Sequence, residues 1–275
     1  MNYQLMQGDC LEIMAGMEAQ SVDATICDPP YGTTACAWDS VIPFAPMWEC
    51  IKRVIKPRVA VVLFGSQPFT SALVMSNPKW FKYCWVWEKS LVGDVMNAKN
   101  KPMKKHEDIA VFSNGTTANC SDRLMPYNPQ GIIKINQVKN NYYRLDGQAT
   151  FKPRRPSHEK SWLQEFANYP TTILKFANGN QDSPHPTAKP VALMSYLIKT
   201  YTNPGETVLD FTMGSGSTGV ACAETGRAFI GIEQDHTYFQ VAQERIEKAY
   251  RRATGQARLG KATDFDNLPM FAEVS

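Results

Sequence analysis

The stretch Asp28-Pro29-Pro30-Tyr31 directly follows the apolar run 22–27. The run is short and partly β-branched, and prolines cannot continue a sheet ladder, so the pattern predicts a buried strand that ends just before Asp28. The Asp28 carboxylate and the Pro29 carbonyl are two acceptors suited to the two protons of a nucleobase amine. Pro30 fixes the backbone, and Tyr31 offers a face on which a planar base can stack. The alternative is a proline turn with a solvated aspartate.

A second group of residues suited to bind a ligand lies in the last third of the chain. A predicted strand over 206–211 enters a glycine-rich turn, and the strand predicted over 228–232 ends in an acid. The ligand-binding candidates here are Asp210, Phe211, Gly214, Gly216 and Glu233. Glycines allow a sharp turn and close approach, and the acid can accept both ribose hydroxyls. The glycine spacing also matches the dinucleotide fingerprint, so a nicotinamide dehydrogenase is the alternative from this stretch alone.

Two further candidates stand where a loop meets a helix. Asp9 follows the predicted strand 3–8 and precedes a helix over 11–17, where it can either face a ligand or cap the helix. Lys189 belongs to His185-Pro186-Thr187-Ala188-Lys189-Pro190, which introduces a helix whose apolar positions from Val191 to Tyr201 follow the 3.6-residue period. Lys189 is either a ligand-binding lysine or a surface lysine at a proline-rich helix entry.

The remaining pattern predicts an α/β fold with a mostly parallel sheet. The aliphatic run 59–64 is typical of a central parallel strand, between helices predicted over 46–56 and 69–75. Strands are also expected over 83–88 and 108–112, separated by a cationic loop at 97–106 that is suited to face phosphates. A last helix is predicted over 236–250. Periodicity is lost from 113 to 184, where asparagines, cations and aromatics are mixed.

Composition sets limits on the class of protein. With 275 residues, 43% of them hydrophobic, the chain can form one sizeable core or one core with an inserted lobe. No apolar run approaches the roughly 20 residues of a membrane span, and the N-terminus does not resemble a signal peptide, so we expect a cytoplasmic protein without a membrane partner. Seven cysteines without a Cys-x-x-Cys pair predict reduced thiols and no metal site. The net charge of +3 requires any DNA surface to be a local patch.

The motifs taken together resemble the β-group DNA amino-methyltransferases of bacteria and phages. Asp28-Pro29-Pro30-Tyr31 resembles their catalytic motif, residues 185–190 resemble their His-Pro-Thr-x-Lys-Pro signature, and the stretch 210–219 resembles their cofactor motif. The catalytic motif precedes the cofactor motif, which is the permuted order of the β-group. Within this family Asp-Pro-Pro-Tyr is typical of adenine-N6 enzymes and Ser-Pro-Pro-Tyr of cytosine-N4 enzymes.

The resemblance implies a Rossmann-like methyltransferase fold with permuted motif order and an inserted target-recognition lobe. The implied parts are a catalytic half at 1–112, a target-recognition region at 113–184, a cofactor-binding half at 185–250 and a C-terminal tail at 251–275. The expected reaction moves a methyl group from S-adenosylmethionine to a flipped-out adenine in DNA, as in restriction-modification systems. The expected catalytic residues are Asp28, Pro29, Pro30 and Tyr31. The expected cofactor-binding residues are Asp9, Asp28, Lys189, Asp210, Phe211, Gly214, Gly216 and Glu233.

Other functions remain open at the level of sequence. They are a DNA cytosine-N4 methyltransferase, an RNA methyltransferase and a non-catalytic DNA-binding protein. The tail segment 266–271 resembles short peptides by which bacterial DNA enzymes hold the sliding clamp, although Asn267 stands where glutamine is usual; the alternative is a tail that packs on its own core. Enzymes of this group often pair, so a homodimer is a further expectation.

Overall fold

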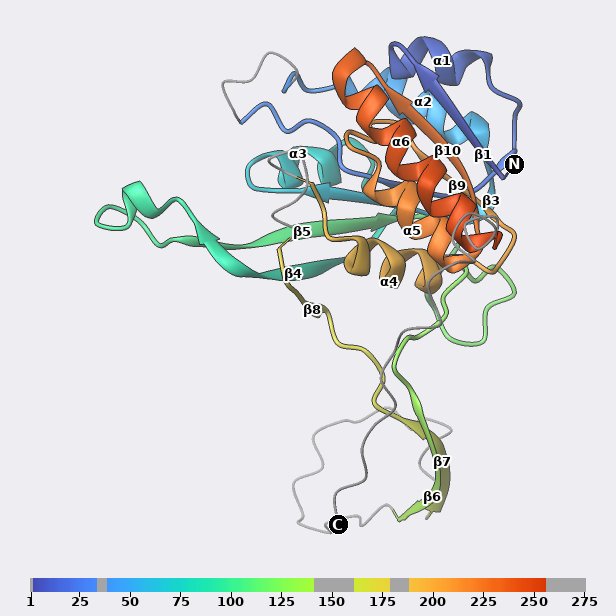
Figure 1. Cartoon of the computed structure of the whole chain (residues 1–275). Coiled ribbons are helices and arrows are strands. Elements are labelled where there is room, and N and C mark those ends of the chain that lie inside the picture. Colours follow the sequence, from blue (N-terminus) through green and yellow to red (C-terminus); the bar gives the residue numbers. More distant parts are fainter. Residues whose placement is uncertain (1, 34–38, 141–160, 179–187, 256–275) are drawn as a thin grey trace, which may run out of the picture. The chain divides into compact units, whose positions relative to one another are not determined.

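The computed structural model describes residues 2–33, 39–140, 161–178 and 188–255 (Figure 1). The chain divides into two compact units, which are described separately. One comprises residues 1–128 and 172–275, and the other comprises residues 129–171. The larger unit carries the residues discussed below.

Within its described residues the larger unit has one eight-stranded sheet, with strand order β1-β10-β9-β2-β3-β5-β4-β8. The strands are β1 (Tyr3–Gln7), β2 (Val22–Cys27), β3 (Ile55–Gly65), β4 (Phe81–Gly93), β5 (Lys104–Phe112), β8 (Ile173–Phe176), β9 (Thr207–Asp210) and β10 (Ala228–Glu233). β1, β10, β9, β2 and β3 run parallel, whereas β5 pairs antiparallel with both β3 and β4. This mostly parallel sheet confirms the predicted fold class.

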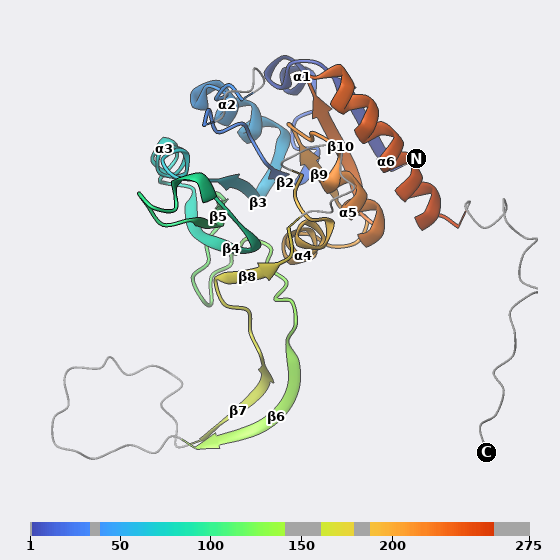
Figure 2. The same ribbon diagram turned by 60° about the vertical axis from the view of Figure 1, so that its left-hand side comes forward.

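Helices cover both faces of the sheet (Figure 2). They are α1 (Cys10–Gly16), α2 (Phe44–Val54), α3 (Phe69–Ser76), α4 (Val191–Tyr201), α5 (Ser217–Thr225) and α6 (His236–Ala253), with a short 3₁₀ turn, η1 (Val95–Asn97). The first three helices pack in one buried cluster and the last three in the other. Successive residues of β3 alternate between these clusters: Val62 and Phe64 face α4–α6, while Val61 and Leu63 face α1–α3. Burial on both faces explains why this strand is continuously apolar.

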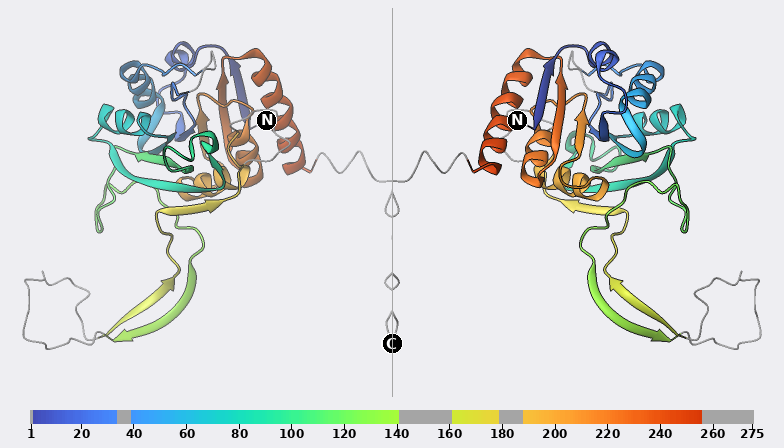
Figure 3. Two further views of the ribbon diagram at one scale, coloured as in Figure 1. Left: turned by 90° about the vertical axis from the view of Figure 1, so that its left-hand side faces the viewer. Right: turned by 90° about the vertical axis from the view of Figure 1, so that its right-hand side faces the viewer.

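The chain order creates a crevice at the middle of the sheet. From β2 the chain continues through α2 to β3 on one side, whereas from β9 it continues through α5 to β10 on the other. β2 and β9 are nevertheless paired directly, with Ala24 opposite Val208, and β1 lies beside β10 (Figure 3). The helices therefore diverge at the carboxyl ends of β2 and β9. In open α/β sheets such a switch point is where ligands bind.

The structure corrects two expectations about elements. Residues Lys104–His106 were predicted within a cationic loop but begin β5, because β4 and β5 extend as a ribbon beyond β3. The described residues of the predicted irregular region 113–184 form three strands: β8, which joins the main sheet, and β6 (Ile133–Asn140) with β7 (Ser161–Ala167), which form the antiparallel pair of the smaller unit. The smaller unit, residues 129–171, comprises fewer residues than the predicted recognition region 113–184, whose limits stay a prediction.

The described residues offer neither a membrane span nor a metal site. No described helix is both long and apolar enough to cross a membrane. No group of three or more histidine, cysteine or acidic side chains in the described ranges is arranged to hold a metal ion.

Candidate active site

A cavity of about 980 Å³ lies at the carboxyl edge of the parallel strands. The four residues Asp28-Pro29-Pro30-Tyr31, here called the proline motif, line it together with Asp9, Lys189, Asp210, Phe211, Gly214 and Glu233. They converge because β1, β2, β9 and β10 are parallel and end at the same edge, so residues distant in sequence meet there. Gly216 is the predicted site residue that does not line the cavity.

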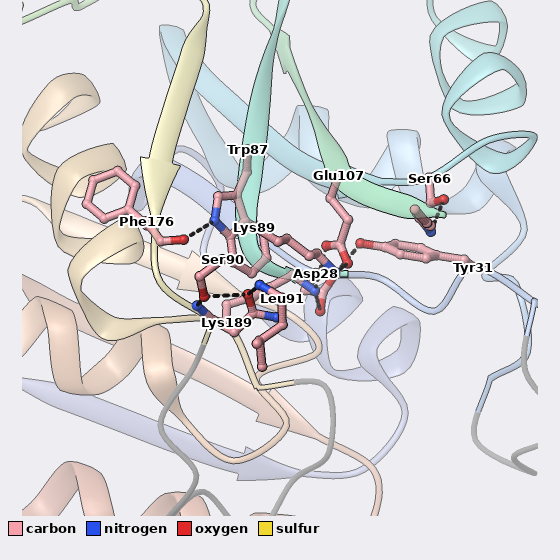
Figure 4. Close-up of polar contacts among 12 residues, drawn as sticks. Asp28, Tyr31, Ser66, Trp87, Lys89, Ser90, Leu91, Glu107, Phe176 and Lys189 are labelled. Carbon is pink, nitrogen blue, oxygen red and sulfur yellow. Dashed lines mark hydrogen bonds and ion pairs between the residues drawn. The ribbon is translucent and has the colours of Figure 1, made fainter. Parts of the chain in front are cut away.

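Asp28 is the centre of the polar contacts in this cavity (Figure 4). The Tyr31 hydroxyl donates to Asp28 Oδ1 at 2.5 Å, and the Lys189 ammonium forms an ion pair with Asp28 Oδ2. Lys189 is buried, and its Nζ also lies 5.2 Å from the centre of the Phe64 ring. Burial would lower the pKa of Lys189, but the charges of Asp28 and Glu107 outweigh this and raise it. Lys189 is therefore a charged partner of Asp28.

Glu107 is a further charged residue of the site that the sequence reasoning missed. Its Oε2 lies 3.2 Å from Lys189 Nζ, and its Oε1 accepts a hydrogen bond from the Lys89 ammonium. Burial would raise the pKa of Glu107, but the charges of Lys189 and Lys89 lower it. The four side chains thus form a row of alternating charge, in which Asp28 contacts Lys189, Lys189 contacts Glu107, and Glu107 contacts Lys89.

The position of Glu107 follows from the direction of its strand. β5 is antiparallel to β3, and Asp108 pairs with Gly65, the last residue of β3. The beginning of β5 therefore meets the carboxyl ends of the parallel strands. The predicted loop ended at 106 and the predicted strand began at 108, so Glu107 was assigned to neither. Glu107 lies in the polar stretch Lys104-Lys105-His106-Glu107-Asp108 that precedes the apolar part of β5, so its sequence context gave no signal for burial.

The backbone after β2 is held from two directions. Both carboxylate oxygens of Asp39 accept from the turn, Oδ1 from the Gly32 amide and Oδ2 from the Thr33 amide, each at 2.8 Å. The Thr212 hydroxyl donates to the Asp28 carbonyl at 3.0 Å. Among the described residues no hydrogen bond reaches the Pro29 carbonyl, so this carbonyl stays available as the second acceptor predicted for an amine.

Comparison with known proteins identifies the family. A family model for DNA methylases that act on N6 or N4 amines matches residues 22–244. The chain belongs to this family. The match contains both the proline motif and the glycine-rich turn, which removes the nicotinamide dehydrogenase alternative.

Relatives with known names agree with this assignment. The type II methyltransferase M.HpaI of Haemophilus parainfluenzae is 26% identical over 263 residues, which cover 91% of this chain and 76% of the relative. The crystal structure of the M1.HpyAVI complex with S-adenosylmethionine has a TM-score of 0.57 at 26% identity and covers 88% of this chain and 99% of that one. The PvuII DNA methyltransferase, specific for cytosine N4, has a TM-score of 0.63 at 14% identity with 93% of each chain covered, which shows the common fold.

S-adenosylmethionine is the cofactor of this DNA methylase, and the cavity contains suitable groups for it. The loop after β9 lines one wall with Phe211 and Gly214, and Gly214 adopts a positive φ of 51° that favours glycine. Glu233 ends β10 and accepts from the Gly214 amide through Oε2 and from the Asp235 amide through Oε1, both at 2.8 Å. Its carboxylate lies at the end of β10 and lines the cavity, and its contact with the ribose hydroxyls stays a prediction. Burial raises the pKa of Glu233.

Asp210 and Asp9 line the cavity and accept hydrogen bonds from backbone amides beside it. Asp210 is buried and accepts from the Thr218 hydroxyl at 2.5 Å and from the Thr212 amide at 3.2 Å. Burial raises its pKa to about 7, against the opposing effect of these hydrogen bonds. Asp9 Oδ1 accepts from the Leu11 amide at 2.8 Å, so this residue both caps α1 and lines the cavity. The two interpretations of Asp9 are compatible.

Gly216 has a packing role in place of a position in the cavity. It adopts a positive φ of 81° before α5, and a Cβ there would lie 3.1 Å from the Ala242 backbone and 2.9 Å from Ile246 Cδ1. Gly219 is enclosed in the same way by Ile246 and Phe229. These glycines let α5 approach α6, whereas Gly214 faces the ligand space.

Several predicted parts lie outside the described residues. They are His185, Pro186 and Thr187 of the lysine signature, Thr34 of the loop after Tyr31, the basic stretches 141–144 and 151–155, and the clamp-like segment 266–271.

Proposed function

We propose that this DNA methylase transfers a methyl group from S-adenosylmethionine to N6 of a flipped-out adenine at a specific DNA sequence. The observation that carries the proposal is the position of the Asp28 carboxylate, which shares one cavity with the cofactor wall formed by Phe211, Gly214 and Glu233. A direct transfer requires that the cofactor and the group that holds the target amine lie in the same cavity.

The chain's own residues supply positioning and charge stabilisation. The amine of a nucleobase is a weak nucleophile because its lone pair is delocalised into the ring. Asp28 and the Pro29 carbonyl accept its two protons, which favours the tetrahedral nitrogen and stabilises the positive charge that develops on it. When bound, the cofactor supplies an electrophilic methyl group on a sulfonium. Lys189 orients Asp28 by its contact with Oδ2, and the Tyr31 hydroxyl donates a hydrogen bond to Oδ1.

Residues around the base complete the pocket for a planar ring. The Tyr31 ring packs on the Phe69 ring with centroids 5.1 Å apart, and Lys189 Nζ lies 5.8 Å from the centre of the Tyr31 ring. We expect a base to stack on the part of this ring that lines the cavity. A base that enters the cavity displaces water, and each polar contact within the cavity becomes stronger because the local dielectric constant falls. The choice of adenine rests on the aspartate of Asp28-Pro29-Pro30-Tyr31, because the cytosine-N4 form of the motif starts with serine.

Cytosine N4 is the second candidate, because both amines present the same two protons to Asp28 and the PvuII enzyme shares the fold. The test is incubation of the purified protein and S-adenosylmethionine with unmethylated genomic DNA, followed by digestion and mass spectrometry of the nucleosides. We expect N6-methyladenine. N4-methylcytosine would keep the mechanism and correct the base, and the absence of both would refute methylation of DNA.

The role of Asp28 is tested in the same assay. Asp28→Asn retains the shape but offers one acceptor oxygen in place of two and loses the charge, so we expect turnover to fall at least 100-fold, on the order of a lost transition-state charge contact. Titration calorimetry with the cofactor measures whether the cavity is intact. Turnover at the parental rate would remove Asp28 from the mechanism.

Three finer proposals concern assembly and role. A homodimer is tested by light scattering during size-exclusion chromatography. Contact with the sliding clamp through 266–271 is tested by titration of the clamp with that peptide, where we expect at most weak saturable binding. A role beside a paired restriction endonuclease is tested by whether methylated DNA resists a nuclease that cuts the same sequence.

A further inference from the structure

The strands β4 and β5 continue beyond the rest of the sheet as a two-stranded ribbon, here called the finger and defined as residues 88–106. The last residue of β3 pairs with Asp108, while the pairs Glu88 with His106 and Gly93 with Lys104 lie past that edge. β4 runs six residues beyond Trp87, and its pairing with β5 has a register shift between Glu88 and Gly93. Figure 1 shows the ribbon leaving the body of the sheet.

The finger leaves large apolar side chains in solvent. The exposed ones are Leu91, Val92, Val95, Met96 and Met103, and Met96 is 96% exposed. A single two-stranded ribbon has no core in which to bury them, so the sequence places them on the surface. Contiguous exposed apolar groups on a folded protein mark interaction sites.

The charge around the apolar tip is positive. Between residues 94 and 105 the chain has Lys99, Lys101, Lys104 and Lys105 and one acid, Asp94. Lys101 pairs with Asp94 at 2.9 Å and Lys105 with Glu88 at 3.0 Å. Lys99 forms no ion pair with the residues that the structure describes. A cationic ribbon suits a polyanion better than a neutral protein surface.

The base of the finger is part of the active site. Lys89 and Glu107 belong to the strands that form the finger, and Glu107 and Lys104 line the cavity. The finger therefore projects from the same sheet edge at which the cavity lies. A duplex that delivers a base into this cavity must lie across this edge, within reach of the finger.

We propose that the finger enters a groove of the DNA duplex and inserts Val95 and Met96 beside the flipped base, while Lys99 contacts a phosphate. A two-stranded ribbon fits the major groove, and apolar side chains such as methionine are used as wedges between base steps. The wedge fills the space left in the stack and opposes the return of the base. The inference rests on the proposed function, since it requires a base to leave the duplex.

The test compares the variant Val95→Ser/Met96→Ser with the control Met75→Ser, which removes a methionine that is 71% exposed on α3. Sequencing of the methylated genomic DNA first gives the recognised site for a short duplex. We expect the double variant to bind S-adenosylmethionine as the parent does but to lose at least tenfold in single-turnover rate. On the same duplex with a mismatch at the target base, which is already unstacked, the rate should recover to within twofold of the parent.

Other results would overturn the inference. These are the parental rate on the matched duplex, an equal loss on the mismatched duplex, an equal loss in Met75→Ser, or a dimer that dissociates in the double variant. For Lys99→Gln we expect the slope of log affinity against log salt to become shallower by about 0.9, and an unchanged slope would remove the phosphate contact. Absence of methylation by the parental protein would refute the proposed function and this inference together, whereas a defect confined to the variant tests the finger alone.

Discussion

The substitution Glu107→Gln tests the charge network around Asp28, Lys89 and Lys189. Glu107 is 8% exposed, and it pairs with Lys89 and with Lys189, which is itself 8% exposed. The amide keeps the size of the side chain but removes the charge that compensates two ammonium groups. Breaking a buried ion pair by removing one partner costs about 3–5 kcal/mol. We therefore expect the free energy of unfolding to fall by about that amount at pH 7.

The assay is urea unfolding followed by tryptophan fluorescence, with Glu88→Gln as the matched control. Glu88 lies on β4 and pairs with Lys105 and Lys175 on the solvent side of the finger, where water screens the charges. We expect the control to unfold as the parent does. An equal loss of stability in both variants would show that burial of Glu107 is not the cause.

The pH dependence distinguishes a charge effect from a packing effect. The two lysines lower the pKa of Glu107 in the folded state, so its charge stabilises the fold above the unfolded-state pKa of about 4.3. This stabilisation is lost as the pH falls through the lower folded-state pKa. The difference between parent and Glu107→Gln should be constant near neutral pH and shrink in acid. A difference that grows from pH 7 towards pH 4 would refute the reasoning.

Two further substitutions test the cofactor side. Burial raises the pKa of Asp210 from 3.8 to about 7, so the folded state binds this proton and the parent loses stability as the pH rises from about 4 to 7. Above pH 7 the free energy of unfolding of Asp210→Asn, measured in urea, should exceed that of the parent by up to about 4 kcal/mol. Equal stability at pH 8 would contradict the raised pKa. A Cβ at Gly219 would lie 2.5 Å from Ile246 Cδ1, so Gly219→Ala should lower thermal stability by about 1–3 kcal/mol. The control Gly16→Ala meets no atom within 4 Å and should not be destabilised.

The sequence predicted those site residues whose position follows from strand ends. Asp28 and Glu233 directly follow or end apolar strands, and parallel strands bring such positions to one edge. Lys189 was predicted from its motif, but its partners depend on the folded arrangement. Glu107 was missed because an antiparallel strand reverses which of its ends meets the site, and strand direction is not encoded in local periodicity. The role of Gly216 depends on α6, which begins 20 residues later in the chain.

The predicted irregular region shows a second limit. β6 and β7 have polar and apolar residues mixed along a ribbon without a core, so hydrophobic periodicity gives a weak signal for them. β8 has four residues, and its Leu174 is buried against the main sheet. Short strands that complete an existing sheet are specified by their neighbours more than by their own pattern.

The pairing of β2 with β9 sets the order in which the protein can be completed during synthesis. Ala24 meets Val208, so the edge of the strand that delivers Asp28 stays unpaired until 184 further residues have been added. At 5–20 residues per second this interval is roughly 10–40 s. Throughout it the ribosome-bound chain carries an apolar strand edge and no cofactor wall. The permuted order therefore makes the last quarter of the chain the step that both protects β2 from aggregation and creates the enzyme.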